Sequence, residues 1–149
     1  MMELRIAFGA DDTNPTVDAV RARLAERAEL VPVPDDLAWP SMARRVGEMV
    51  AAGTVDLGVL MCWTGTGTAI AANKVHGVRA AQASDPWIAR GARLWNDANV
   101  LTLSLKRLEP DDAVACVDAF LDTTQPDPDE ANAIALLRSI DDDRAPGDR

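Results

Sequence analysis

The feature that most constrains the fold of this chain is a regular alternation of short apolar runs with helical patterns. The clearest run, 55–61, is almost unbroken and is followed by the glycine-rich stretch CWTGTGT and then by a helical pattern. Such a run is typical of a strand that is buried on both faces of a parallel sheet. Four further runs predict strands at 4–8, 30–33, 78–81 and 100–105.

Helical patterns follow each of these runs. Apolar residues at helical spacing predict helices at 15–28, 39–52, 69–74, 86–94, 110–121 and 130–140. Asn14 is a suitable N-cap for the first helix, and Pro15 suits its first position. Strands that alternate with helices predict an α/β fold with right-handed connections. We therefore expect a Rossmann-like three-layer αβα sandwich around a five-stranded parallel sheet, as one domain over 1–141 with a charged tail at 142–149.

Composition excludes several classes of partner. The 149 residues have a net charge of −9, aromatic residues make up 4%, and tyrosine is absent. An acidic chain repels nucleic acid and anionic membranes, and it has few rings on which bases would stack. No apolar stretch approaches the roughly 20 residues of a membrane span, and the first ten residues do not resemble a signal peptide. We expect a cytoplasmic protein with neither kind of partner.

The two cysteines, Cys62 and Cys116, lie in separate apolar contexts. Their spacing predicts neither a disulfide framework nor a zinc site. Cys116 suits a small core position on a helix. We expect no metal site and no cofactor.

Polar clusters follow three of the predicted strands, at 9–12, 62–68 and 84–85. In an open parallel sheet, ligands bind beyond the carboxyl ends of the strands, so these clusters are expected to converge. Gly65 and Gly67 allow two interpretations of the middle cluster. They permit a tight strand-to-helix turn, or they let backbone N–H groups approach an anion at the start of the helix.

Three segments then point to a known family. The stretch CWTGTGTAIAANKVHGVRAA resembles C-G-T-G-x-G-x-x-I-A-A-N-K-x-P-G-x-R-A-A, a signature of the ribose-5-phosphate isomerase B and galactose-6-phosphate isomerase family. ARGARLWNDANVLTL resembles A-R-x-x-R-E-H-N-D-A-N-V-L-x-L, and RIAFGADD resembles the opening I-A-x-G-x-D-H. The similarity extends from about Leu4 to Leu121.

The resemblance implies aldose–ketose isomerisation through an enediolate, with Cys62 as the base that moves the proton. A thiol beside a helix N-terminus ionises readily, and the loop 64–68 would hold the enediolate oxygen as an oxyanion hole does. The catalytic candidates are Cys62, Thr64 and Asp11. The substrate-binding candidates are Asp12, Trp63, Gly65, Thr66, Gly67, Thr68, Asn73, Ser84, Asn96 and Lys106. The resemblance also implies a homodimer or a dimer of dimers, with the helix at 128–140 packed on the partner subunit.

Several residues depart from the family pattern. Asp12, Ser84 and Trp95 stand where the family has histidines, and the single histidine, His76, suits a surface turn. The family's C-terminal G-G-R-H-x-x-R, whose arginines hold the substrate phosphate, is replaced by the acidic segment 127–133. Lys106 matches another family arginine.

Trp63 replaces the small residue that follows the cysteine. Its ring would narrow the site, stack on a sugar, or simply pack against its neighbours.

These departures leave three functions open. The first is an aldose–ketose isomerase acting on a sugar without phosphate or with an unusual charge. The second is a conventional sugar-phosphate isomerase whose phosphate site is rebuilt from Lys106, Arg93 and Arg44 or Arg45. The third is a non-catalytic homologue that binds a sugar-like ligand, a possibility suggested by the missing histidines.

Overall fold

The structure is a computed structural model that describes residues 3–143. Its strands are β1 (Arg5–Ala10), β2 (Glu29–Val31), β3 (Leu57–Cys62), β4 (Ala80–Gln82) and β5 (Val100–Ser104). Its helices are α1 (Pro15–Arg27), α2 (Trp39–Ala51), α3 (Thr66–Ala72), α4 (Pro86–Asn96), α5 (Pro110–Asp122) and α6 (Ala131–Asp142), with a short 3₁₀ turn at Pro128–Glu130 before α6. All five strands are parallel, in the order β2-β1-β3-β5-β4.

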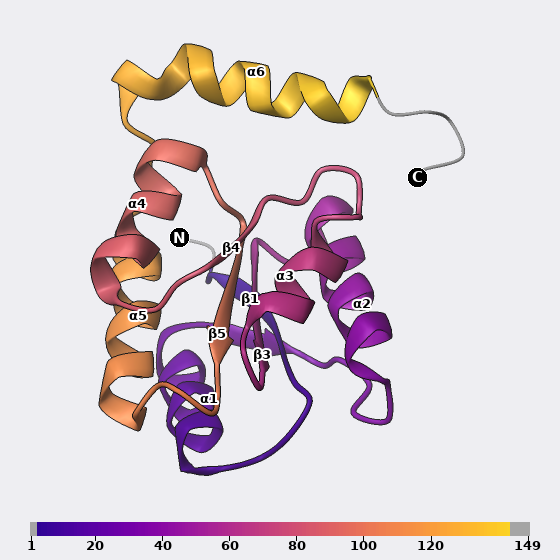
Figure 1. The fold of residues 1–149 in the computed structure, drawn as a ribbon, viewed down its shortest axis with the longest axis vertical. Coiled ribbons are helices and arrows are strands. Elements are labelled where there is room, and N and C mark those ends of the chain that lie inside the picture. Colours follow the sequence, from indigo (N-terminus) through magenta and orange to yellow (C-terminus); the bar gives the residue numbers. More distant parts are fainter. Residues whose placement is uncertain (1–2, 144–149) are drawn as a thin grey trace.

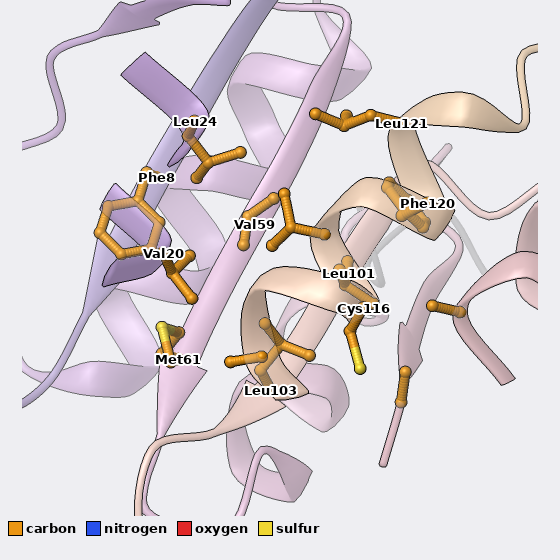
Figure 2. Close-up of a cluster of buried hydrophobic side chains, with 14 of the residues drawn as sticks. Phe8, Val20, Leu24, Val59, Met61, Leu101, Leu103, Cys116, Phe120 and Leu121 are labelled. Atoms are coloured by element: carbon orange, nitrogen blue, oxygen red, sulfur yellow. The ribbon is translucent and has the colours of Figure 1, made fainter. Parts of the chain in front are cut away.

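The sheet separates two layers of helices (Figure 1). Ile6 and Phe8 of β1, Val59 and Met61 of β3, and Leu101 and Leu103 of β5 pack with α1, α4 and α5. Ala7, Leu60 and Val100 point to the other face, where α2 and α3 lie. Figure 2 shows the first cluster, with Phe120 and Cys116 of α5 packed against β3 and β5. This alternation along buried strands confirms the predicted three-layer αβα fold.

Two helices begin as their sequences predict. The side chain of Asn14 accepts a hydrogen bond from the Val17 N–H at the start of α1, and Asp85 does the same for the Ile88 N–H of α4. In both helices proline occupies the first position, where its missing N–H costs nothing.

Most boundaries differ from prediction by one to three residues, and β3, α3 and β4 are examples. β3 begins at Leu57, two residues later than expected, and just before it the Asp56 carboxylate accepts the Arg5 N–H while the Asp56 N–H donates to the Arg5 carbonyl. α3 begins at Thr66 rather than at 69, so the glycine-rich loop supplies the first turn of the helix. β4 is Ala80–Gln82, two residues later than expected at its start. A charged tail is predicted at 142–149. Its first residue, Asp142, is the last residue of α6, and residues 144–149 lie outside the described residues.

The topology places one end of β1 beside one end of β3. β1 connects to β2 on one side through α1, whereas β3 lies on its other side and leads into α3 on the opposite face. This reversal of strand order opens a crevice at the carboxyl ends of β1 and β3. The N–H of Asp11 donates to the carbonyl of Met61 at 3.1 Å, which holds the residue after β1 beside the end of β3.

None of the helices within residues 3–143 has the length and apolar character that a membrane crossing requires.

Candidate active site

Cys62 is the last residue of β3, and its thiol is buried beneath the loop that follows. Its Sγ accepts a hydrogen bond from the Gly65 N–H at 3.2 Å and lies 3.3 Å from Oγ1 of Thr68. Thr68 is fully buried, so its hydroxyl contacts the sulfur inside the protein. The Gly65 N–H therefore points at the sulfur from the loop that covers it.

The loop takes this shape because Gly65 adopts φ +79, a conformation that side chains rarely allow. A Cβ at Gly65 would lie 3.0 Å from the backbone carbon of Leu103, so the loop also approaches β5 too closely for any side chain. Two hydrogen bonds fix the loop to neighbouring strands: Thr102 Oγ1 donates to the Gly65 carbonyl at 2.7 Å, and Gln82 Nε2 donates to the Thr64 carbonyl at 2.6 Å. The thiol and its donor are therefore held rigidly.

A pocket of about 410 Å³ opens above the thiol. It is lined by Asp11, Trp39, Cys62, Trp63, Thr64, Thr66 and Gly67. The hydroxyls of Thr64 and Thr66 lie 2.6 Å apart at its edge. The first N–H groups of a helix have no carbonyl partner within it, and at the start of α3 the Thr66 N–H donates instead to Oγ1 of Thr64 at 3.3 Å.

Two adjacent carboxylates stand at the mouth of the pocket. Partial burial, together with the neighbouring charge of Asp12, raises the pKa of Asp11 above its ordinary value. Hydrogen bonds from the Thr13 N–H and from the Trp63 indole lower the pKa of Asp12, with a further contribution from Lys106. Carboxyls whose pKa values are pushed apart suit different roles in proton transfer.

Trp63 is held on both sides. Its Nε1 donates to Oδ2 of Asp12 at 3.1 Å, and Nζ of Lys106 lies 4.7 Å from the ring centroid, within cation–π range. Its carbonyl accepts from Oγ of Ser104 at 2.5 Å, which fixes the backbone as well.

Seven predicted binding residues do not line this pocket. Four of them contact a residue that does, namely Asp12, Gly65, Thr68 and Lys106. The other three are Asn73, Ser84 and Asn96. The Asn73 side-chain amide accepts a hydrogen bond from the Ala80 N–H and donates one to the Ala80 carbonyl, so it links the end of α3 to β4. Asn73 and Asn96 instead line a separate cavity of about 320 Å³ that is partly covered by α6. Ser84 follows β4, the edge strand, and β5 lies between β4 and β3.

The cations considered for a phosphate site have different environments. Lys106 lies beside Trp63 at the pocket. Arg93 donates to the carbonyls of Thr123 and Ala98 at 3.0 and 2.6 Å, so it is committed within the chain. Nε of Arg44 lies 3.8 Å from Glu48, and a further cation, Arg138 of α6, pairs with Asp97.

The remaining histidine and cysteine have structural surroundings. His76 is half-buried in its turn, rather than fully at the surface, with Nδ1 4.0 Å from Asp141 of α6. Burial, with smaller effects of Asp85 and Asp112, raises the pKa of Cys116 to about 11, as expected for an inert core thiol. Within residues 3–143, no three His, Cys, Asp or Glu side chains gather closely enough to bind a metal ion.

Trp39 is the pocket residue that the sequence interpretation missed. The sequence predicts only that Trp39 begins the helix at 39–52. Its ring packs against Gly67, where an added Cβ would lie 2.9 Å from Trp39 Cζ3. The requirement for glycine at 67 is thus steric, and only a three-dimensional view reveals its partner.

The model of the Ribose/Galactose Isomerase family matches residues 6–136. The chain belongs to this family. The match includes every residue that lines the pocket, and it confirms the resemblance and the aldose–ketose isomerase class inferred from the sequence.

Relatives in the Ribose/Galactose Isomerase family are similar over most of their length. Ribose-5-phosphate isomerase B of Escherichia coli is 39% identical over 125 residues, covering 78% of this chain and 83% of the relative. D-erythrulose-4-phosphate isomerase 2 of Mycolicibacterium smegmatis is 34% identical over 141 residues, covering 89% and 92%. The structure of Clostridium thermocellum ribose-5-phosphate isomerase B superposes with a TM-score of 0.86 at 28% identity, covering 95% of this chain and all of the other.

Proposed function

We propose that this protein interconverts an aldose and the corresponding ketose by moving one proton between adjacent carbons, with Cys62 as the base. The observation that carries the proposal is the Gly65 N–H bonded to Sγ of Cys62 at the floor of a pocket that Asp11 also lines. Family membership and the named activities of the relatives support the same chemistry.

The reaction balances with groups on the protein. The Cys62 thiolate takes the proton from the carbon next to the carbonyl, and the C–H electron pair forms the carbon–carbon double bond of an enediolate. The carbonyl oxygen gains negative charge, which the N–H groups at the start of α3 stabilise. The thiol then returns the proton to the former carbonyl carbon, and the neighbouring hydroxyl becomes the new carbonyl.

A second proton must move between the two oxygens during this exchange. Thr64 and Asp11 line the pocket beside Cys62 and are suited to that transfer. The raised pKa of Asp11 makes its carboxyl a better proton donor near neutral pH than an ordinary aspartate. Asp11 thereby takes part of the work that the absent histidines would perform.

The substrate we propose is a small sugar phosphate. The relatives above are named for phosphorylated substrates, and this favours a phosphate over the uncharged sugar that the sequence departures suggested. Lys106, beside Trp63, is the cation of the described pocket region best placed to attract the phosphate.

A sugar without phosphate is the second candidate, and one observation favours it. Asp11 lines the pocket and Asp12 stands next to it, while Arg93 and Arg138 are engaged elsewhere in the chain. The two negative charges of these carboxylates outweigh the single positive charge of Lys106, so a phosphate dianion is repelled.

The test is incorporation of solvent deuterium into free and phosphorylated sugars of four to six carbons, followed by NMR. We expect exchange at the carbon next to the carbonyl and a higher kcat/KM for phosphorylated members, with competitive, salt-sensitive inhibition by inorganic phosphate. A preference for free sugars would establish the second candidate. Absence of exchange in the whole panel would contradict the isomerase proposal and favour a binding protein.

A further inference from the structure

We infer that Trp63 is a specificity-determining residue that limits the substrate to a short carbon chain, and that Asp12 holds it in place. This inference rests on the proposed isomerase function. The structural basis is an exposed indole fixed at the rim of the pocket that contains Cys62.

Trp63 is not a core residue. Its relative exposure is 58%, yet it lines the same pocket as the thiol that directly precedes it in the chain. A large exposed side chain normally samples several rotamers, at a cost in entropy when it is fixed. Here the indole N–H bonds Asp12 and the ring faces the ammonium of Lys106, so the side chain has a defined position without being buried.

Two indoles bound the pocket. Trp39 lines it as well, and its ring presses against Gly67 at the start of α3. Aromatic rings of this size each cover about 150–250 Å² and present flat apolar faces. Such walls suit the C–H edges of a sugar and leave its oxygens to the loop.

The family signature has a glycine at the position of Trp63. The family name covers ribose and galactose, and one relative is named for the four-carbon erythrulose phosphate, so related pockets accept chains of different length. Because an indole fills space that a glycine leaves open, this chain is expected to favour the shorter substrates.

The experiment compares kcat/KM for aldose phosphates of four, five and six carbons in the wild type, Trp63→Gly, Asp12→Ala and Trp87→Gly. Trp87 is the matched control, because it is similarly exposed, packs edge-to-face with Trp95 at a ring-centroid distance of 5.4 Å and does not line the pocket. We expect Trp63→Gly to raise the six-carbon to four-carbon ratio by about tenfold or more, in the range that one or two carbon units contribute to discrimination. Asp12→Ala should move the ratio in the same direction by a smaller factor, and Trp87→Gly should leave it unchanged.

An equal change for all three substrates in Trp63→Gly, or the same shift in Trp87→Gly, would overturn the inference while leaving the isomerase proposal intact. No change of ratio in Asp12→Ala would overturn the role of Asp12. A wild type that turns over no member of the panel would instead overturn the proposed function. Should circular dichroism show that Trp63→Gly does not fold, Trp63→Phe serves as the second variant, with a several-fold shift expected in the same direction.

Discussion

At the residue scale, the central feature is a thiol whose surroundings are built from main-chain groups. The Gly65 N–H reaches Sγ of Cys62 because glycine allows the loop to turn back over the strand end. A side chain at this position would meet the backbone of β5, so the geometry depends on the absence of a Cβ.

Replacing Cys62 tests this feature directly. We expect Cys62→Ala to reduce solvent exchange into the substrate by about 10²–10⁴-fold, the usual contribution of a general base. Cys62→Ser should recover little, because a hydroxyl ionises far less readily than a thiol. The control is Cys116→Ala, which removes a core thiol and should lower the melting temperature while activity is retained. Full activity in Cys62→Ala would assign the base to another group, Asp11 first.

Asp11 also has a measurable effect on stability. Its pKa is raised in the folded state, so its stabilising contribution is complete below the ordinary value of 3.8 and is lost as pH rises through the folded-state pKa. We therefore expect Asp11→Asn to melt at a slightly higher temperature than the wild type at pH 7. The difference should disappear when both are melted in acid. A lower melting temperature for Asp11→Asn at pH 7 would contradict this sign.

At the element scale, helices on the same face of the sheet are joined by charged groups. Asp118 of α5 accepts hydrogen bonds from Nε of Arg23 and Nη1 of Arg27, both on α1, at 2.8 and 3.0 Å. Partial burial opposes ionisation of Asp118, but these two arginines outweigh it and lower the pKa of the carboxyl. The pair α1 and α5 covers β1 and β3, so this link supports the layer beneath the pocket.

Asp118→Asn is expected to lower the free energy of unfolding by about 1 kcal/mol at pH 7, or about 2–4 °C in melting temperature. Since the folded-state pKa of Asp118 is depressed, its contribution is present above the ordinary value and is lost as pH falls through the folded-state value. The variant and wild type should therefore converge in acid. Asp35→Asn, in an exposed loop, is the control and should melt like the wild type. A loss that is equal at all pH values would show that the charge of Asp118 is not its cause.

At the scale of the whole molecule, the pocket and α6 lie at opposite edges of the sheet. α6 contacts Gly77 and Asp97, which precede β4 and β5, whereas Cys62 ends β3 (Figure 1). Within α6, Ile134 is buried, but Leu136 is 70% and Ile140 is 60% exposed. Exposed apolar side chains in a row mark a surface that another molecule covers.

We predict that a second copy of the chain covers this surface and forms a homodimer. Sedimentation at micromolar concentration should give twice the monomer mass of 15.9 kDa, and Leu136→Glu combined with Ile140→Glu should give a monomer. Asn132→Glu, a polar position of α6, is the control and should remain dimeric. A monomeric wild type would contradict the prediction.

The sequence by itself determined the order and type of the elements, because burial on one or two faces imposes periods of two or 3.6 on apolar residues. It also determined that Asp11 and the Cys62 loop lie at the same edge of the sheet, since carboxyl ends of parallel strands share an edge. It did not determine the bond between the Asp56 carboxylate and the Arg5 N–H, because such a side-chain contact leaves no periodic signal.

Only the tertiary structure decided which candidates share one pocket. Trp39 lines it from a helix that begins 23 residues before Cys62. The Asn73 amide is instead hydrogen-bonded to Ala80 of β4, and Asn96 lines the separate cavity at the opposite edge of the sheet. The tether between Trp63 and Asp12, two residues 51 positions apart, likewise exists only once β1 pairs with β3. The physical reason is the same in each case: such contacts depend on the distance between side chains from different elements, and a pattern along one chain does not encode that distance.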